Sequence, residues 1–173
     1  MVRQMKLNLS GRLILLLTVT VLLAPIASVS AQDSDPNHLS GGWAITITLP
    51  DNPLGLPTTV QILGNFTQDG SFIFSDSLGK FGPGLTQSPG HGQWARTAKG
   101  EFTLDSWHLV FDNAGQFFGL SRGQASIKFD PKEGKITGTN FLQLIPNVGG
   151  PLPGLPGKLE GHRLAIEPPP PTP

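Results

Sequence analysis

The chain has 173 residues, including 22 glycines, 17 prolines and no cysteine, and its twelve basic side chains balance twelve acidic ones. The charges are scattered, which argues against a nucleic-acid-binding protein, because such proteins gather their basic residues in a patch or stripe. Without cysteine, a disulfide framework and a lipid anchor on cysteine are both excluded, so packing and backbone hydrogen bonds must hold the fold.

The first 31 residues have the features of a bacterial-type secretory signal peptide. Three basic residues and no acidic residue accompany an uncharged apolar run over residues 13–24. Val29 and Ala31 occupy the two positions that signal peptidase inspects. The apolar run ends at Pro25 and is shorter than the roughly 18 residues that a membrane-spanning helix needs. We therefore expect cleavage after Ala31, a secreted or periplasmic location, and no transmembrane anchor in the mature protein.

The 142 residues that remain (173 minus 31) are enough for one domain with a core of its own. Nine basic residues then face twelve acidic ones, which gives the mature chain a net charge of −3. We expect a flexible segment over residues 32–40, a β-barrel domain over 41–167, and a proline-rich tail over 168–173.

Eight short strands are predicted in this domain, because apolar and β-branched residues alternate with polar ones between clusters of Gly, Pro, Asn and Asp. In the first of them, Trp43, Ile45 and Ile47 fall on one side of an extended chain. The predicted strands are residues 42–49, 58–68, 71–78, 92–97, 101–112, 116–129, 135–144 and 157–166. No window shows helical periodicity, so the predicted fold class is all-β.

Short turn sequences join many of these strands as hairpins. They lie at residues 68–70, 98–100, 112–115 and 130–134. Gly119 and Gly123 predict a bulge or bend in the strand that contains them. The strand over 101–112 is ambiguous, because Phe102 and Leu104 are in one phase and Trp107, Leu109 and Phe111 in the other. Either a bulge or two covered faces would explain this pattern.

Loop lengths favour a closed up-and-down barrel over a two-sheet sandwich. The three long connections, residues 50–57, 79–90 and 145–156, all fall at the same end of the strands. A Greek-key sandwich would distribute its long connections over both ends. We therefore predict an eight-stranded antiparallel up-and-down barrel with no C-terminal helix, because the chain runs from the last strand into prolines.

The same phase assignment predicts which side chains fill the barrel. Eleven large apolar residues point inward: Trp43, Ile45, Ile47, Val60, Ile62, Phe66, Phe72, Phe74, Trp94, Ile127 and Phe129. Four small residues, Gly119, Ser121, Gly123 and Ala125, share one wall. Because a barrel of eight strands is just wide enough to hold one small ligand, small residues opposite aromatic ones make a cavity plausible.

Two motifs at the ends of the barrel sequence resemble those of a known superfamily. Gly41-Gly42-Trp43 opens the first strand, and Arg163 lies in the last. This combination resembles the calycins, the superfamily of lipocalins, fatty-acid-binding proteins and avidins. The resemblance implies that Arg163 packs across Trp43 at the closed end of the barrel, and that both residues are structural. A guanidinium on an indole ring is a favourable cation–π arrangement.

Two of the long loops are rich in leucine and proline, and they would surround the mouth of the barrel. Leu54 and Leu56 lie in one, and Leu152 and Leu155 in the other. Leucines on proline-stiffened loops suggest a lid on an apolar cavity or a contact surface, unless the loops pack on one another over the barrel end. The candidate ligand-binding residues in the cavity or mouth are Leu54, Leu56, Phe72, Phe74, His91, Trp94, His108, Leu152 and Leu155.

The two histidines in that set have different environments in the sequence. His91 stands between glycines, where it is suited to proton transfer near neutral pH or simply faces water in a turn. His108 lies mid-strand and is expected inside the barrel. No His-x-His pair, no cysteine and no G-x-S-x-G motif occurs in the chain. We therefore expect no metal site, no cofactor and no serine-hydrolase chemistry.

Three functions remain open. The first is a secreted, non-catalytic barrel that binds a small apolar molecule. The second is a cyclase- or isomerase-type barrel enzyme, which needs a buried polar group such as His91, His108 or Arg122 in its cavity. The third is an envelope-associated interaction domain with a filled barrel. An enzyme is the less favoured reading, because no catalytic motif is specific.

Overall fold

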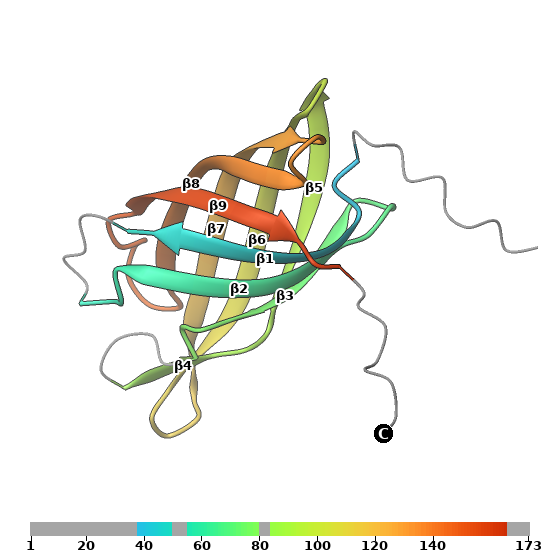
Figure 1. The fold of residues 1–173 in the computed structure, drawn as a ribbon. Coiled ribbons are helices and arrows are strands. Elements are labelled where there is room, and N and C mark those ends of the chain that lie inside the picture. Colours follow the sequence, from blue (N-terminus) through green and yellow to red (C-terminus); the bar gives the residue numbers. More distant parts are fainter. Residues whose placement is uncertain (1–37, 50–54, 80–83, 166–173) are drawn as a thin grey trace, which may run out of the picture. The chain divides into compact units, whose positions relative to one another are not determined.

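The computed structural model describes residues 38–49, 55–79 and 84–165, which form a closed antiparallel β-barrel (Figure 1). No helix occurs within these ranges. The strands, in chain order, are β1 (Gly41–Thr48), β2 (Thr59–Phe66), β3 (Ser71–Asp76), β4 (Leu85–Gln87), β5 (Gly90–Ala98), β6 (Glu101–Asp112), β7 (Phe117–Asp130), β8 (Lys135–Pro146) and β9 (Leu155–Arg163).

Neighbouring strands pair in up-and-down order. Two further features close the barrel and place the nine strands of the described ranges at eight positions around the wall. β9 returns to pair with β1, so that Trp43 lies opposite Arg163. β4 and β5 both pair with β6, β4 through residues 110–112 and β5 through residues 101–107. The two strands thus share one position beside β6. The predicted all-β, eight-stranded up-and-down barrel is confirmed.

Two connections predicted as long loops are shorter in the structure. Strand β4 lies inside the predicted loop 79–90, and β5 begins at Gly90 rather than at residue 92. Likewise β8 continues to Pro146 and β9 begins at Leu155, which shortens the predicted 145–156 loop. These extensions depend on cross-strand pairing, such as that of Thr86 with Phe111, which the local sequence does not encode.

The two faces of the barrel wall follow the predicted phase. All eleven large residues predicted to point inward are at most 9% exposed, as expected for a packed interior. In β6, the inward residues are Phe102, Leu104, Ser106, His108 and Val110, all buried. The ambiguity in this strand is resolved without a bulge between Phe102 and Val110. Leu109 is 47% exposed on the outside, and the register shift falls after Val110, opposite Gly119.

Glycines on the inner face allow aromatic rings to lie directly against the backbone. A Cβ atom at Gly90 would stand 2.2 Å from the ring of Phe74, and one at Gly64 would stand 2.5 Å from the ring of Phe72. Real Cβ atoms do not approach other atoms so closely. The rings of Phe72 and Phe74 also stack on one another, with centroids 4.8 Å apart.

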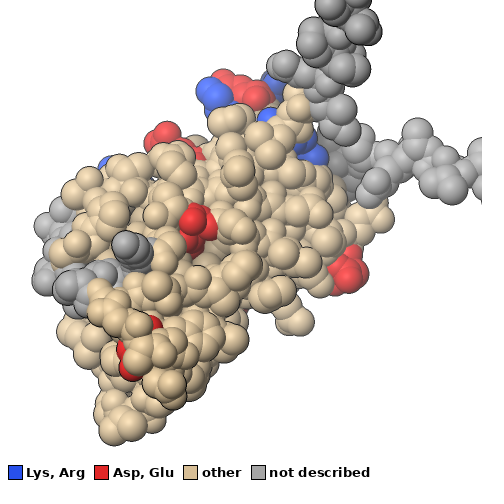
Figure 2. Space-filling view, turned by 90° about the horizontal axis from the view of Figure 1, so that it is seen from below, with Lys and Arg blue, Asp and Glu red and all other residues tan. Residues whose placement is uncertain are grey.

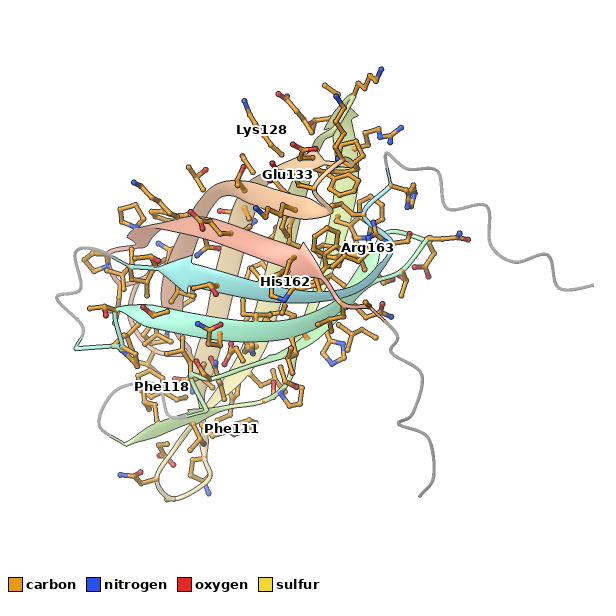
Figure 3. All side chains as sticks on the ribbon, viewed as in Figure 1. Phe111, Phe118, Lys128, Glu133, His162 and Arg163 are labelled. Carbon is orange, nitrogen blue, oxygen red and sulfur yellow. The ribbon has the colours of Figure 1, made fainter. Side chains whose placement is uncertain are left out.

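The two ends of the barrel differ in their surface. We call the end with the β2–β3, β5–β6 and β7–β8 connections the turn end, and the opposite end the loop end. Charged residues at the turn end form ion pairs, Lys128 with Glu101 and Lys135 with Glu133. Phe111 and Phe118 lie toward the loop end, away from Lys128 and Glu133 (Figure 3). On the face seen in Figure 2, the Lys and Arg side chains lie along one edge, and most of the surface carries none.

Candidate ligand-binding cavity

A cavity of about 40 Å³ lies inside the barrel. Most of its wall is apolar and comes from strands on both sides of the interior. The apolar lining residues are Ile45, Ile47, Leu49, Val60, Ile62, Phe72, Phe74, Leu78, Leu104, Leu142 and Leu159. Leu49 and Leu78 follow β1 and β3, so the cavity extends toward the loop end.

Four polar side chains interrupt this apolar wall: Asp76, Ser106, His108 and Asn140. Each follows the inward phase of its strand, so the alternation that buries the core also buries these groups. Gly123 lines the cavity beside them, and a Cβ at that position would lie 2.9 Å from Ser106 Oγ and 3.9 Å from Asn140 Oδ1. The missing side chain at Gly123 therefore keeps space open next to two polar groups.

The Asp76 and His108 side chains form a buried pair in this wall, only 6% and 7% exposed. His108 Nε2 lies 3.4 Å from Asp76 Oδ2, and His108 Nδ1 lies 2.8 Å from the Ser88 carbonyl oxygen. Asp76 also accepts hydrogen bonds from Leu78 N–H at 2.9 Å and from the Gln87 amide at 2.8 and 3.0 Å. Both polar groups are thus held by protein atoms, as buried charged groups require.

The turn end is covered by the segment that precedes β1. The Arg163 guanidinium lies over the Trp43 ring, 4.9 Å from its centroid, and donates to the carbonyl of Ser40 and, at 2.8 Å, to that of His38. Trp43 Nε1 donates to the Leu39 carbonyl at 2.7 Å, and Leu39 is fully buried. Partial burial lowers the pKa of the Arg163 guanidinium from its ordinary value. These contacts match the arrangement that the calycin resemblance implies for Trp43 and Arg163.

An aromatic cluster fills the interior beneath this cover. Trp43 packs edge-on against Phe66 and Phe129, and Trp94 packs in the same way against Phe66 and Phe102. Edge-to-face pairs of this kind contribute beyond the area they bury. The interior is therefore filled at the turn end, and the free volume lies further along the barrel.

Seven of the nine predicted site residues fall into three groups. Phe72, Phe74 and His108 line the cavity. Leu56 and Leu155 are buried in the core, and Leu152 packs against it, but none of the three lines the cavity. Leu54 lies outside the described residues.

The remaining two candidates lie away from the cavity. Trp94 belongs to the aromatic cluster at the turn end, where its Nε1 donates to the Thr67 carbonyl at 3.1 Å. His91 is exposed on the outer face of β5, opposite Trp107.

Arg122 is likewise on the outer face of the barrel. It donates to Asp105 through Nε at 2.9 Å and Nη2 at 2.6 Å, and it stacks on Trp107 at 4.7 Å. The hydrogen bond to Asp105 raises the pKa of the Arg122 guanidinium. Of the three polar groups that the enzyme hypothesis named, His108 alone lines the cavity.

Sequence reasoning did not identify Asp76, Ser106 and Asn140 as site residues. The signal was nevertheless present in the alternation. Asp76 continues the inward phase of Phe72 and Phe74, and Ser106 continues that of Leu104. A polar residue in phase with a buried apolar series is a candidate cavity residue.

Comparisons with known protein families and with curated protein sequences give no match to this chain. None of the described residues belongs to a helix with the length and hydrophobicity needed to cross a membrane. Within the same ranges, no three His, Asp or Glu side chains gather where they could hold a metal ion. The geometry of the barrel is therefore the guide to function.

Proposed function

We propose that the mature protein is a secreted, non-catalytic, calycin-like barrel that binds a small, mainly apolar molecule in its interior. The observation that carries this proposal is the cavity, whose wall is apolar on most sides and includes a few polar groups on one side. Ligand sites in proteins have this composition, with apolar walls for affinity and few polar groups for orientation.

The way the barrel is filled supports binding at a defined depth. Aromatic rings and the Arg163–Trp43 contact fill the turn end, so an occupant would lie between this cluster and the loop end. The apolar surface available to it comes from strands on opposite sides of the barrel, such as Ile45 of β1 and Leu104 of β6. An occupant would therefore be enclosed rather than held against one face.

The geometry of His108 argues against the enzyme alternative. One ring nitrogen contacts the Ser88 carbonyl oxygen and the other faces Asp76, so neither is directed at a ligand. A general base needs a free lone pair within hydrogen-bond reach of the proton it removes. The filled-barrel alternative is weaker because free volume remains between the apolar walls.

The test is native mass spectrometry of the mature protein, residues 32–173, purified from its own secreted fraction and followed by organic extraction. We expect a co-purifying apolar molecule, or binding after incubation with a panel of lipids and terpenoids. An unoccupied protein that takes up no member of the panel would contradict the proposal.

A matched pair of variants locates the binding. Gly123→Val adds methyl groups next to Ser106 in the cavity, where a Cβ meets no backbone atom within 4 Å. Gly150→Ala adds a methyl group where no atom lies within 4 Å. We expect the first variant to lose ligand and the second to retain it. Equal occupancy of both would place the ligand outside the cavity.

A further inference from the structure

The side chain of Asn140 is the polar group of the cavity that protein atoms leave unsatisfied. The residue is only 8% exposed, lies on the inner face of β8 and lines the cavity. No protein group among the described residues forms a hydrogen bond with its amide. Ser106, Asp76 and His108, the other polar side chains of the wall, all have protein partners.

The Asn140 amide keeps a small accessible surface in the cavity, and polar groups in protein interiors almost always have a partner, from the protein or from ordered water. The partner of Asn140 must therefore come from whatever occupies the cavity. The amide offers both a donor and an acceptor, so it can serve an occupant that accepts, donates or does both.

The hydroxyl group of Ser106, next to Asn140, limits which ligand groups can bind there. Ser106 Oγ donates its proton to the Gly123 carbonyl at 3.0 Å, so it presents only lone pairs to the cavity. The space above Gly123 separates Ser106 Oγ from Asn140 Oδ1. The polar wall thus offers one donor group, the Asn140 amide N–H₂, beside acceptors from Asn140 and Ser106.

The charges of the side chains that line the cavity exclude an anionic ligand. No lysine or arginine lines the cavity within the described residues, and the wall already contains the Asp76 carboxylate. A carboxylate or phosphate buried there would have no counter-charge, and an uncompensated buried ion is strongly unfavourable. The Asp76 carboxylate is already held by His108, Leu78 N–H and the Gln87 amide, so no free acidic group favours a cation either, and a neutral occupant fits this wall best.

We propose that the ligand is a small neutral alcohol or phenol, with its apolar body against the isoleucine and leucine walls and its hydroxyl between Asn140 and Ser106. A hydroxyl group accepts from the Asn140 amide N–H₂ and donates its one proton to Ser106 Oγ or to Asn140 Oδ1, so it uses the donor and one of the two acceptors. This inference rests on the proposed function, because it names the class of molecule that the cavity binds.

The test compares phenol with toluene, which has the same shape but a methyl group in place of the hydroxyl. Both are titrated into the wild-type protein and into Asn140→Leu by calorimetry or NMR. We expect the affinity for phenol relative to toluene to fall at least ten-fold in the variant. A change of this size corresponds to the loss of about one hydrogen bond to a buried partner. Asn65→Leu changes an asparagine on the outer face of β2 and should leave this ratio unchanged.

The outcomes separate the two proposals. If toluene binds and the ratio is the same in wild-type and Asn140→Leu, the cavity binds ligands but Asn140 is served by water, and the alcohol inference is wrong. If neither compound binds the wild-type protein, the binding function fails as well. Should Asn140→Leu not fold, Ser106→Ala replaces it, with an expected fall of roughly three-fold in the ratio; an unchanged ratio would overturn the inference.

Discussion

Replacing Arg163 with alanine removes the side chain that connects the last strand to the segment before the first. The guanidinium lies over the rings of Trp43 and Phe129, at 4.9 and 5.6 Å, and donates to the carbonyls of Ser40 and His38. Alanine leaves both carbonyls without this donor and exposes the edge of the aromatic cluster.

The expected loss follows from these contacts. A cation–π contact at a partly exposed position contributes about 1 kcal/mol. Hydrogen bonds to charged groups are worth about 1.5 to 3 kcal/mol, and we take ~1 kcal/mol for each of these two because the side chain is half-buried. The free energy of unfolding should therefore fall by ~3 kcal/mol, or about 10 °C in Tm for a domain of this size.

Arg96→Ala is the matched control. Arg96 also lies over an aromatic ring, that of Phe102 at 5.5 Å, but its side chain is exposed. We expect a smaller loss than for Arg163→Ala, because contacts made by exposed side chains contribute little. Urea denaturation followed by tryptophan fluorescence measures both variants. Equal losses, or an Arg163→Ala loss below about 0.5 kcal/mol, would refute a stabilising role for the Arg163 contacts beyond that of an exposed pair.

Three further predictions concern packing, the buried pair and processing. Gly90→Ala places a Cβ 2.2 Å from an aromatic ring and should lower the free energy of unfolding by about 2 to 3 kcal/mol. Gly150→Ala, in open space, should be neutral, and equal thermal melts of the two variants would contradict the close approach. Asp76→Ala leaves its buried histidine partner unpaired and should cost about 3 kcal/mol in urea denaturation. Asp105→Ala breaks an ion pair on the surface and should cost much less; the reverse order would refute the assignment of the buried pair. Ala31→Arg should block removal of the first 31 residues, and a wild-type mature mass that differs from that of residues 32–173 would disprove cleavage at that site.

The barrel itself was predictable from the sequence because its strands are joined by hairpins. Local turn sequences and period-two alternation define each strand and its inner face, as Trp43, Ile45 and Ile47 illustrate. Strand β4 was not predictable in the same way, since Thr86 finds its partner, Phe111, only after the barrel closes. The extension of β9 back to Leu155 depends on pairing with Leu142 for the same reason.

The cavity was predictable in part. The alternation placed Phe72 and Phe74 inside, and the small residues of β7 indicated space. The alternation could not show which of the inward polar side chains have hydrogen-bond partners. Whether a polar group in phase with the core is satisfied, like Asp76, or free, like Asn140, depends on atoms from other strands. The exposure of His91 was one of the two alternatives that its position between glycines left open.

The most direct test of the central claim is the position of a bound ligand in solution. In a sample with ¹³C-labelled isoleucine, leucine and valine methyl groups, toluene should show intermolecular NOEs to Ile45, Ile62 and Leu104 on the inner face. The exposed methyl groups of Leu63 and Ile73, on the outer face of the same barrel wall, serve as internal controls. NOEs to the inner set alone would establish binding inside the barrel, and NOEs confined to the outer set would contradict it.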